Sequence, residues 1–147
     1  MKLRRVMAPI DFSEQSRAAL READELAAER GAELLLLHVH QIVEVAVLDF
    51  TYVERPEAVG EVCDAAEAEL RRWSADLRTP AERILVRVAT GSPVDEIVRA
   101  TRECDLVVMA THGRTGLSHF LMGSVSERVV QGAACTVLVV KRPAGAA

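Results

Sequence analysis

The sequence is poor in aromatic residues and has no excess of positive charge. Aromatic residues make up 3% of the 147 residues, and the net charge is −4. Binding to nucleic acid or to an anionic membrane surface needs a basic face, so we expect neither partner. No apolar run approaches the roughly 20 residues of a membrane-spanning helix, so we expect no membrane segment.

Cysteine is also scarce. Cys63, Cys104 and Cys135 are odd in number, scattered, and form no C-x-x-C pair. This spacing argues against a disulfide framework and against a structural zinc site. We therefore expect three small buried residues without a chemical role.

The length and the amino terminus limit the organisation of the chain. Half of the 147 residues are apolar, which suits one domain over residues 1–147 with a sizeable core. The stretch "MKLRRVMAPID" reaches Asp11 before the apolar region of a signal peptide could form. A cytoplasmic location is therefore expected.

Short apolar runs predict five β-strands. "AELLLLHVH" is continuously apolar, as in a strand covered on both faces. "RILVRVA" alternates and is β-branched, which is also typical of a strand. The predicted strands cover residues 4–9, 32–40, 83–89, 104–110 and 135–142.

Helix start and stop signals fill the intervals between these strands. Ser13 predicts the N-cap of a helix that runs to about Arg30, with Gly31 as its C′ residue. Ser92, followed by Pro93, predicts a second N-cap. The stretch 41–55 has mixed character and predicts an irregular excursion. A helix is also expected from Pro56, with Val62, Ala66, Leu70, Trp73 and Leu77 at helical spacing and Pro80 closing it, and another over 124–131.

Strands that alternate with helices predict an α/β fold. The expected architecture is a three-layer, doubly wound, mostly parallel sheet with helices on both faces and right-handed crossovers. Ligands of such sheets bind beyond the carboxyl ends of the strands, where the strand order reverses. This rule selects three segments, Pro9–Asp11, Val39–His40 and Ala110–Gly113.

The stretch "ATHGRTGLSHFLMGSVSERV", residues 110–129, is the strongest candidate for a binding loop. It has neither the GK[ST] of a P-loop nor a GxGxxG that turns directly into a helix. Gly113 and Gly123 would let a ligand approach the backbone closely. The helix start after Gly123, the Ser124 hydroxyl and the Arg114 cation all suit phosphate.

The same stretch has a purely structural interpretation. Ser124 and Glu127 fit the S-x-x-E capping box, which would satisfy the helix start without a ligand. From spacing alone, both a phosphate site and a capped surface loop remain open.

Other polar residues near the strand ends have alternatives as well. Asp11 could accept hydrogen bonds from a ribose or an adenine amine, or it could only begin an Asx-type turn. His38 and His40, with His112 in the loop, suggest a metal, but His38 lies within an apolar run and is expected to be a hydrogen-bonded core residue. We expect no metal ligands, because the sequence has neither a helical HExxH nor a DxD pattern. We expect no catalytic nucleophile, because neither Ser118 nor Ser124 has an identifiable His–Asp pair.

With these residues assembled, the chain resembles the universal stress protein family. The resemblance covers nearly the whole length and depends on "MAPIDFSEQSRAAL", "LLLLHV", "TGSPVDEIVRAT", "DLVVMATHGRTGLSHFLMGSVSERVV" and "CTVLVVKRP". It implies a Rossmann-like, adenine nucleotide α-hydrolase-like fold, with a five-stranded parallel sheet in the order 3-2-1-4-5. The family also commonly pairs its last strand, here 136–141, across a two-fold axis, which implies a homodimer.

The ATP-binding branch of the family has the motif G-x2-G-x9-G-[ST]. The matching positions here are Ala110, Gly113, Gly123 and Ser124, so both spacers are intact and the first glycine is alanine. In the family that first position lies against the ribose. The resemblance implies that Mg²⁺, held by the phosphates, accompanies ATP. The implied nucleotide-binding residues are Pro9, Ile10, Asp11 and Val39 around adenine and ribose, Met109 and Ala110 beside them, and Gly113, Arg114, Gly123, Ser124 and Val125 at the phosphates.

The resemblance predicts a stress-response protein that binds ATP and acts as a nucleotide-dependent regulator or interaction module. Two alternatives stay open. Ala110 and the capping box favour a nucleotide-free dimeric interaction protein, whereas the intact Gly123–Ser124 pair counts against it. A weak ATPase is the other alternative, although Asp11 and Glu127 are the only carboxylates near the loop and neither is an evident general base.

Overall fold

The fold is taken from a computed structural model that describes residues 1–42, 44–111 and 122–141, and for Val47 the backbone alone. Two residues of the expected nucleotide site, Gly113 and Arg114, lie outside the described residues, as do His112 and Ser118. The described residues include both ends of the glycine-rich stretch.

Five parallel strands form the central sheet, as the apolar runs predicted. Their order is β5-β2-β1-β6-β7, which is the expected 3-2-1-4-5 order once the two additional short strands, β3 and β4, are set aside. Every neighbouring pair is parallel, so each connection crosses over the sheet. The α/β fold class is therefore confirmed. The strands are β1 (Arg5–Pro9), β2 (Glu33–His40), β5 (Ile84–Thr90), β6 (Leu106–Ala110) and β7 (Thr136–Val140).

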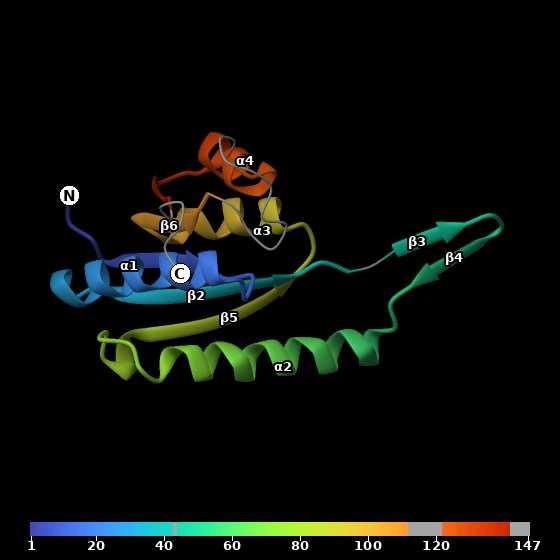
Figure 1. The fold of residues 1–147 in the computed structure, drawn as a ribbon, viewed down its shortest axis with the longest axis horizontal. Coiled ribbons are helices and arrows are strands. Elements are labelled where there is room, and N and C mark those ends of the chain that lie inside the picture. Colours follow the sequence, from blue (N-terminus) through green and yellow to red (C-terminus); the bar gives the residue numbers. More distant parts are fainter. Residues whose placement is uncertain (43, 112–121, 142–147) are drawn as a thin grey trace.

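Helices cover both faces of this sheet (Figure 1). On one face, Leu70 of α2 joins Leu36 of β2 in a buried cluster that also contains apolar residues of α1. On the other face, Ile97 of α3 and Val129 of α4 pack with Leu35. Because side chains alternate along a strand, the continuous "LLLL" run supplies both clusters. The helices are α1 (Glu14–Arg30), α2 (Pro56–Ser74), α3 (Pro93–Ala100) and α4 (Ser124–Gly132), and the short 3₁₀ turns are Ala81–Arg83 and Thr101–Glu103.

The predicted caps of α1 and α3 are confirmed. The Ser13 hydroxyl accepts a hydrogen bond from the Ser16 amide at 3.1 Å, and Gly31 ends α1 with a φ of 63°. The Ser92 hydroxyl accepts from the Asp95 amide at 3.4 Å. These are local interactions, so the sequence signals sufficed to predict them.

The end of α2 differs from the expectation. Pro56 begins the helix and Trp73 lies within it, but the helix ends at Ser74, before Leu77 and Pro80. The reason is a tertiary interaction, because the backbone that follows turns toward α1. There the amides of Arg78 and Thr79 donate to the Asp24 carboxylate, both at 2.8 Å.

The segment 41–55, expected to be irregular, contains an antiparallel ribbon. Strands β3 (Glu44–Val47) and β4 (Phe50–Val53) pair with each other in a separate two-stranded sheet. Leu48 and Asp49 make the two-residue turn, and Leu48 has a φ of 53°. Such turns usually contain Asn-Gly or Asp-Gly, so the sequence lacked the signal that predicts a hairpin.

The expectation of three buried cysteines is correct for Cys104 alone. Cys104 is buried, whereas Cys63 and Cys135 are partly exposed, and all three are free thiols. Within the described ranges, no helix combines the length and the apolar character that crossing a bilayer requires.

Asp105 ties the beginning of β1 to the segment that precedes β6. Its Oδ2 accepts hydrogen bonds from the amides of Arg4 and Arg5, at 2.9 and 3.0 Å. These two donors lower the pKa of the Asp105 carboxyl, the Arg4 amide contributing most. Folding therefore favours the charged form of the Asp105 carboxyl, and the stability of the fold depends on that charge.

We expect Asp105→Asn to lower the free energy of unfolding by about 1 kcal/mol at neutral pH, since a charged acceptor is replaced by a neutral one. The folded pKa lies below the unfolded value of about 3.9, so the contribution is present above that value and disappears as the pH falls through the folded pKa. Urea unfolding at pH 7 and near pH 2 checks this. Asp76→Asn, at an exposed position, is the control. The prediction is contradicted if Asp105→Asn lowers the free energy of unfolding by the same amount at low pH as at pH 7.

Candidate functional site

The carboxyl ends of β1, β2 and β6 lie together at one edge of the sheet. Pro9 is opposite Leu37 in the β1–β2 register, and the Ile10 amide donates to the Leu37 carbonyl at 2.8 Å. On the other side of β1, Val6 and Met7 pair with the beginning of β6. The sheet thus places the three predicted segments, which end β1, β2 and β6, at the same edge.

This edge is where the strand order reverses. From β1 the chain builds the sheet outward through β2 to β5, and it then returns to the other side of β1 to add β6 and β7. In doubly wound folds the crossovers leave the two sides of such a point in opposite directions, and ligands usually bind in the crevice that results. The position is the usual ligand-binding place of doubly wound folds.

Asp11 makes the predicted turn at the end of β1. Its Oδ1 accepts hydrogen bonds from the amide of Ser13, at 3.0 Å, and from the Ser13 hydroxyl. The Asx-type turn is therefore confirmed as a structural role. The turn fixes the carboxylate at the sheet edge, next to the N-terminus of α1.

The residue after Asp11 has an unusual backbone conformation. Phe12 has a φ of 63°, a left-handed value that is costly for a large side chain. Its ring lies 4.7 Å from that of His38 and 5.5 Å from that of Trp73, edge to face with the latter. The Arg17 guanidinium lies 3.8 Å above the Trp73 ring. This stack holds the loop between β1 and α1 in its strained conformation.

The two histidines of β2 have protein partners. His38 Nδ1 donates to the Ile10 carbonyl at 2.7 Å, which confirms the expected hydrogen bond, although His38 is partly exposed rather than a core residue. His40 Nε2 lies 3.0 Å from Glu54 Oε2. This contact joins the last residue of β2 to the residue that follows β4. Within the described parts of the chain, no group of three acidic, histidine or cysteine side chains could hold a metal ion.

The two described ends of the glycine-rich stretch are joined by hydrogen bonds. The Gly123 amide donates to the Thr111 carbonyl at 2.6 Å, and the Ser126 hydroxyl donates to the same carbonyl at 2.8 Å. The Thr111 amide in turn donates to the Val140 carbonyl at 3.2 Å. The N-terminus of α4 is thereby held beside the end of β6 and Ala110.

The predicted capping box of α4 is wrong. Gly123 is the N-cap and Ser124 is the first helical residue, so the helix begins one residue earlier than the box requires. The Glu127 amide donates to the Gly123 carbonyl at 3.0 Å, as an ordinary helical bond. A glycine cap has no side chain that could accept from the first amides. The helix begins early because Ser126 and Gly123 are fixed to Thr111.

The remaining site residues differ in exposure. Ile10 and Met109 are buried, with 3% and 6% of their surface exposed, and they belong to the clusters on opposite faces of the sheet. Ser124 and Val125 are exposed at the beginning of α4. Pro9, Asp11, Val39 and Ala110 are partly exposed along the strand ends. The site therefore has buried apolar residues at the strand ends and an exposed helix terminus beside them.

The thiols lie at the opposite end of the strands. Cys104 precedes β6 and Cys135 directly precedes β7, whereas the site follows the ends of the strands. Burial is the main cause that raises the pKa of Cys104 to about 11 and also raises the pKa of Cys135. Protonated thiols are poor nucleophiles.

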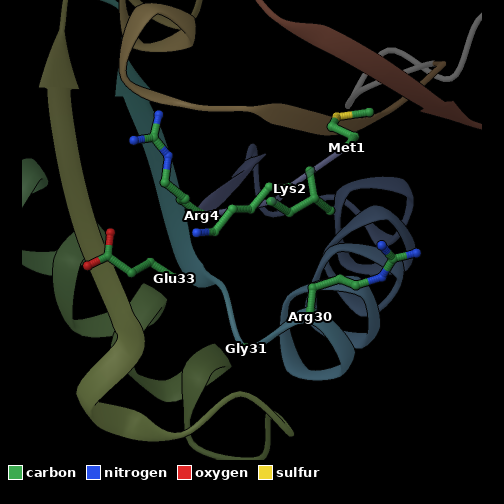
Figure 2. Close-up of a pocket in the computed structure, with 7 residues that line it drawn as sticks. Met1, Lys2, Arg4, Arg30, Gly31 and Glu33 are labelled. Atoms are coloured by element: carbon green, nitrogen blue, oxygen red, sulfur yellow. The ribbon is translucent and has the colours of Figure 1, made fainter.

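A hollow of about 620 Å³ also lies at the edge where the strands begin, away from the predicted site. Figure 2 shows that the Arg30 guanidinium and the Glu33 carboxylate point away from each other rather than into the hollow. Glu33 instead pairs with Arg5, at 2.7 Å. The charged groups do not converge on a common point, so this hollow lacks the arrangement of a binding site. Its lining consists of Met1, Lys2, Leu3, Arg4, Arg30, Gly31 and Glu33.

Sequence reasoning missed several residues that shape the site. Thr111 and Ser126 join the ends of the glycine-rich stretch, and Phe12 supports the β1 loop. The pair Gly123–Ser124 was selected from spacing, but the Thr111–Ser126 bond joins residues 15 positions apart and has no sequence signal. The only local indication that Phe12 shapes this loop is the Ser13 cap that follows it, which places Phe12 in a tight turn.

Comparisons with known proteins agree with this geometry. The sequence model of the universal stress protein family matches residues 2–141. The chain is 33% identical over 146 residues to universal stress protein MJ0531 of Methanocaldococcus jannaschii, covering 95% of this chain and 83% of that protein. Among solved structures, the hypothetical protein MJ0577 is similar with a TM-score of 0.77 at 26% identity, over 97% of this chain and 99% of that one.

A solved complex of a universal stress protein with cAMP has the same fold. Its TM-score is 0.69 at 22% identity, over 95% of this chain and 98% of that chain. Identity at this level shows a shared architecture. The family model, the curated relative and the solved structures thus point to one family.

Proposed function

Because this chain belongs to the universal stress protein family, we propose that it binds ATP at the joined ends of β1, β2 and β6 and acts as a nucleotide-dependent regulator or interaction module. The observation that carries the proposal is the N-terminus of α4. Hydrogen bonds hold it beside the end of β6, and its cap is a glycine without a side chain.

The phosphates would bind at the N-terminus of α4. The first amides of a helix lack intrahelical partners and carry positive partial charge, which suits an anion. In this proposal the amides of Ser124 and Val125 and the Ser124 hydroxyl donate to phosphate oxygens. Both residues are exposed, as such contacts require. The expected contributions of Gly113 and Arg114 remain part of the proposal.

The adenosine would lie across the ends of β1 and β2. Val39 and Pro9 offer partly exposed apolar surface, with Ile10 and Met109 buried behind it. The Asp11 carboxylate, oriented by its turn, would accept from a ribose hydroxyl or the adenine amine. Ala110 would contact the ribose through one methyl more than the glycine of the family motif.

Mg²⁺ would accompany the nucleotide. The described residues supply no cluster of acidic or histidine side chains for a metal, so the phosphate oxygens and water would be its ligands, as is usual for this cation. The ion would neutralise phosphate charge. The chain's own residues would bind and orient the nucleotide, and a general base for hydrolysis is not part of the proposal.

Family members support an adenine nucleotide as the ligand class. One solved universal stress protein is a complex with cAMP, and its architecture matches that of this chain. The alternative of a nucleotide-free interaction protein loses one of its two sequence arguments, because the capping box does not form. Its other argument, Ala110, stays open.

The direct test is titration of Mg-ATP into the untagged protein, together with native mass spectrometry of the freshly purified chain. We expect binding heat at protein concentrations of about 100 μM, where micromolar affinities are measurable. A retained adenine nucleotide in the mass spectrum would identify the ligand. Absence of both heat and retained ligand contradicts the proposal, and phosphate release above a buffer control would favour the weak ATPase.

A homodimer through β7 is also part of the proposed function. This strand is at the end of the sheet and pairs only with β6 among the described strands. Leu138 is 40% exposed along it. An apolar edge strand left unpaired is a hazard that proteins usually cover, and pairing with its own copy about a two-fold axis would do so.

A further inference from the structure

The ribbon of β3 and β4 carries an uncovered apolar face. Val45 is opposite Tyr52 in the ribbon, and opposite residues point to the same face. Phe50, two residues before Tyr52, shares that face because side chains alternate. The exposed fractions are 43% for Val45, 82% for Phe50 and 60% for Tyr52. We call this face the ribbon face.

A ribbon of two short strands is marginally stable in water unless a third strand or another element covers it. Figure 1 shows β3 and β4 projecting beyond the layers of the fold. At the tip, Leu48 is 98% exposed and has the left-handed φ of 53°. A projecting element that presents aliphatic and aromatic side chains to water is typical of an interaction surface.

The base of the ribbon is attached to the sheet. The His40–Glu54 pair joins the last residue of β2 to the residue after β4, with both side chains largely buried at 15% and 14% exposure. This contact anchors the residue that follows β4 to the end of β2. Anchoring at the base lowers the entropy lost when a partner binds the ribbon face.

We propose that the ribbon face binds the ribbon face of a second copy of this chain, with the two ribbons antiparallel about a two-fold axis. The residues of the face carry no charge, so two copies of net charge −4 can meet there without burying a charge. Glu44 points to the opposite face, because it pairs with Val53. A face that repeats on both copies is the requirement of a two-fold interface.

The charges at the rim suit the antiparallel arrangement. Asp49 lies at the tip of the ribbon and Arg55 directly after its base, and neither forms an ion pair within the described ranges. In an antiparallel pair, the tip of each ribbon lies over the base of the other. Asp49 of one copy then faces Arg55 of the second copy, on both sides of the axis.

The size of the face sets the expected affinity. The two aromatic side chains of one ribbon face, Phe50 and Tyr52, can bury about 150–250 Å² each. Even with the area that Val45 and Leu48 add, the face is smaller than the roughly 800 Å² that each partner buries in a stable interface. We therefore expect a reversible association in the micromolar range rather than a permanent dimer.

The first experiment measures mass by sedimentation equilibrium without nucleotide. The protein concentration is about 100 μM, which populates micromolar complexes. We expect the average mass of the wild type to be 1.5- to 2-fold that of Phe50→Ser/Tyr52→Ser. Any assembly through β7 is common to the two proteins and does not account for a difference between them. Thr51→Ser/Val53→Ser, on the opposite face of the same ribbon, should keep the wild-type mass. A monomeric wild type, or equal masses for wild type and Phe50→Ser/Tyr52→Ser, overturns the proposal.

The second experiment remains decisive if the serine variant unfolds the ribbon. Asp49→Arg should weaken association about tenfold, because it places two positive charges together. Asp49→Arg/Arg55→Asp should restore it. Failure of the double variant to recover overturns the antiparallel arrangement. Both experiments are independent of nucleotide, so ATP binding can fail while this interface holds, and the reverse.

Discussion

We expect the Gly123→Val/Ser124→Glu double variant to lose nucleotide binding by at least about 100-fold, equivalent to about 3 kcal/mol. The new carboxylate would lie where the phosphates bind, at the helix terminus whose positive potential attracts them. The valine side chain would fill the space above the cap. The Ser124 hydroxyl would be lost as a donor.

We expect the fold to survive both changes, although valine is a poorer N-cap residue than glycine and costs up to about 1 kcal/mol there. Gly123 has a φ of −60°, which valine adopts readily, and Ser124 is exposed at the first helical position, where a negative charge is favourable. Loss of binding would therefore reflect the site. Titration with Mg-ATP and circular dichroism on the same samples separate the two effects.

A matched control makes similar chemical changes away from this site. Gly60→Val places valine where nothing lies within 4 Å of the new Cβ, and Gln131→Glu adds one carboxylate near the other end of α4. The control variant should bind like the wild type. If Gly123→Val/Ser124→Glu also binds normally, the nucleotide does not use the N-terminus of α4.

The second large effect concerns stability. We expect Asp24→Ala to lower the free energy of unfolding by about 2–4 kcal/mol, since it leaves two amides without their acceptor. Asp24 is 5% exposed, and its carboxylate accepts from the amides of Arg78 and Thr79, both at 2.8 Å. Thr79 is itself buried, so water cannot readily replace the lost acceptor.

Urea unfolding of Asp24→Ala, Asp24→Asn and Glu25→Ala tests this expectation. Asparagine keeps one oxygen acceptor, so its effect should be intermediate. Glu25 lies next to Asp24 on α1, but its only ion pair with the described residues is an exposed contact of 3.5 Å with Arg78, for which a loss below about 1 kcal/mol is expected. An Asp24→Ala loss as small as that of Glu25→Ala contradicts the assigned role.

Some parts of the candidate site could be predicted from the sequence, and others could not. Its strand-end segments could be selected from the sequence, because parallel strands that alternate with helices bring their carboxyl ends to one edge. The bond between Ser126 and Thr111 could not, since it joins residues that only the folded sheet brings together. That bond, with the Gly123–Thr111 contact, also moved the beginning of α4 and removed the predicted capping box.

By itself, the sequence determined the five strands of the central sheet, most helix ends and the fold class. Ser13, Gly31 and Ser92 act on amides and carbonyls a few residues away, and the continuous apolar run of β2 can be satisfied only between two helical layers. The tertiary structure decided the end of α2 at Ser74, the cap of α4 and the ribbon that projects from the sheet. Each of these depends on contacts between segments distant in sequence or on a turn without the usual glycine, and local patterns carry no information about either.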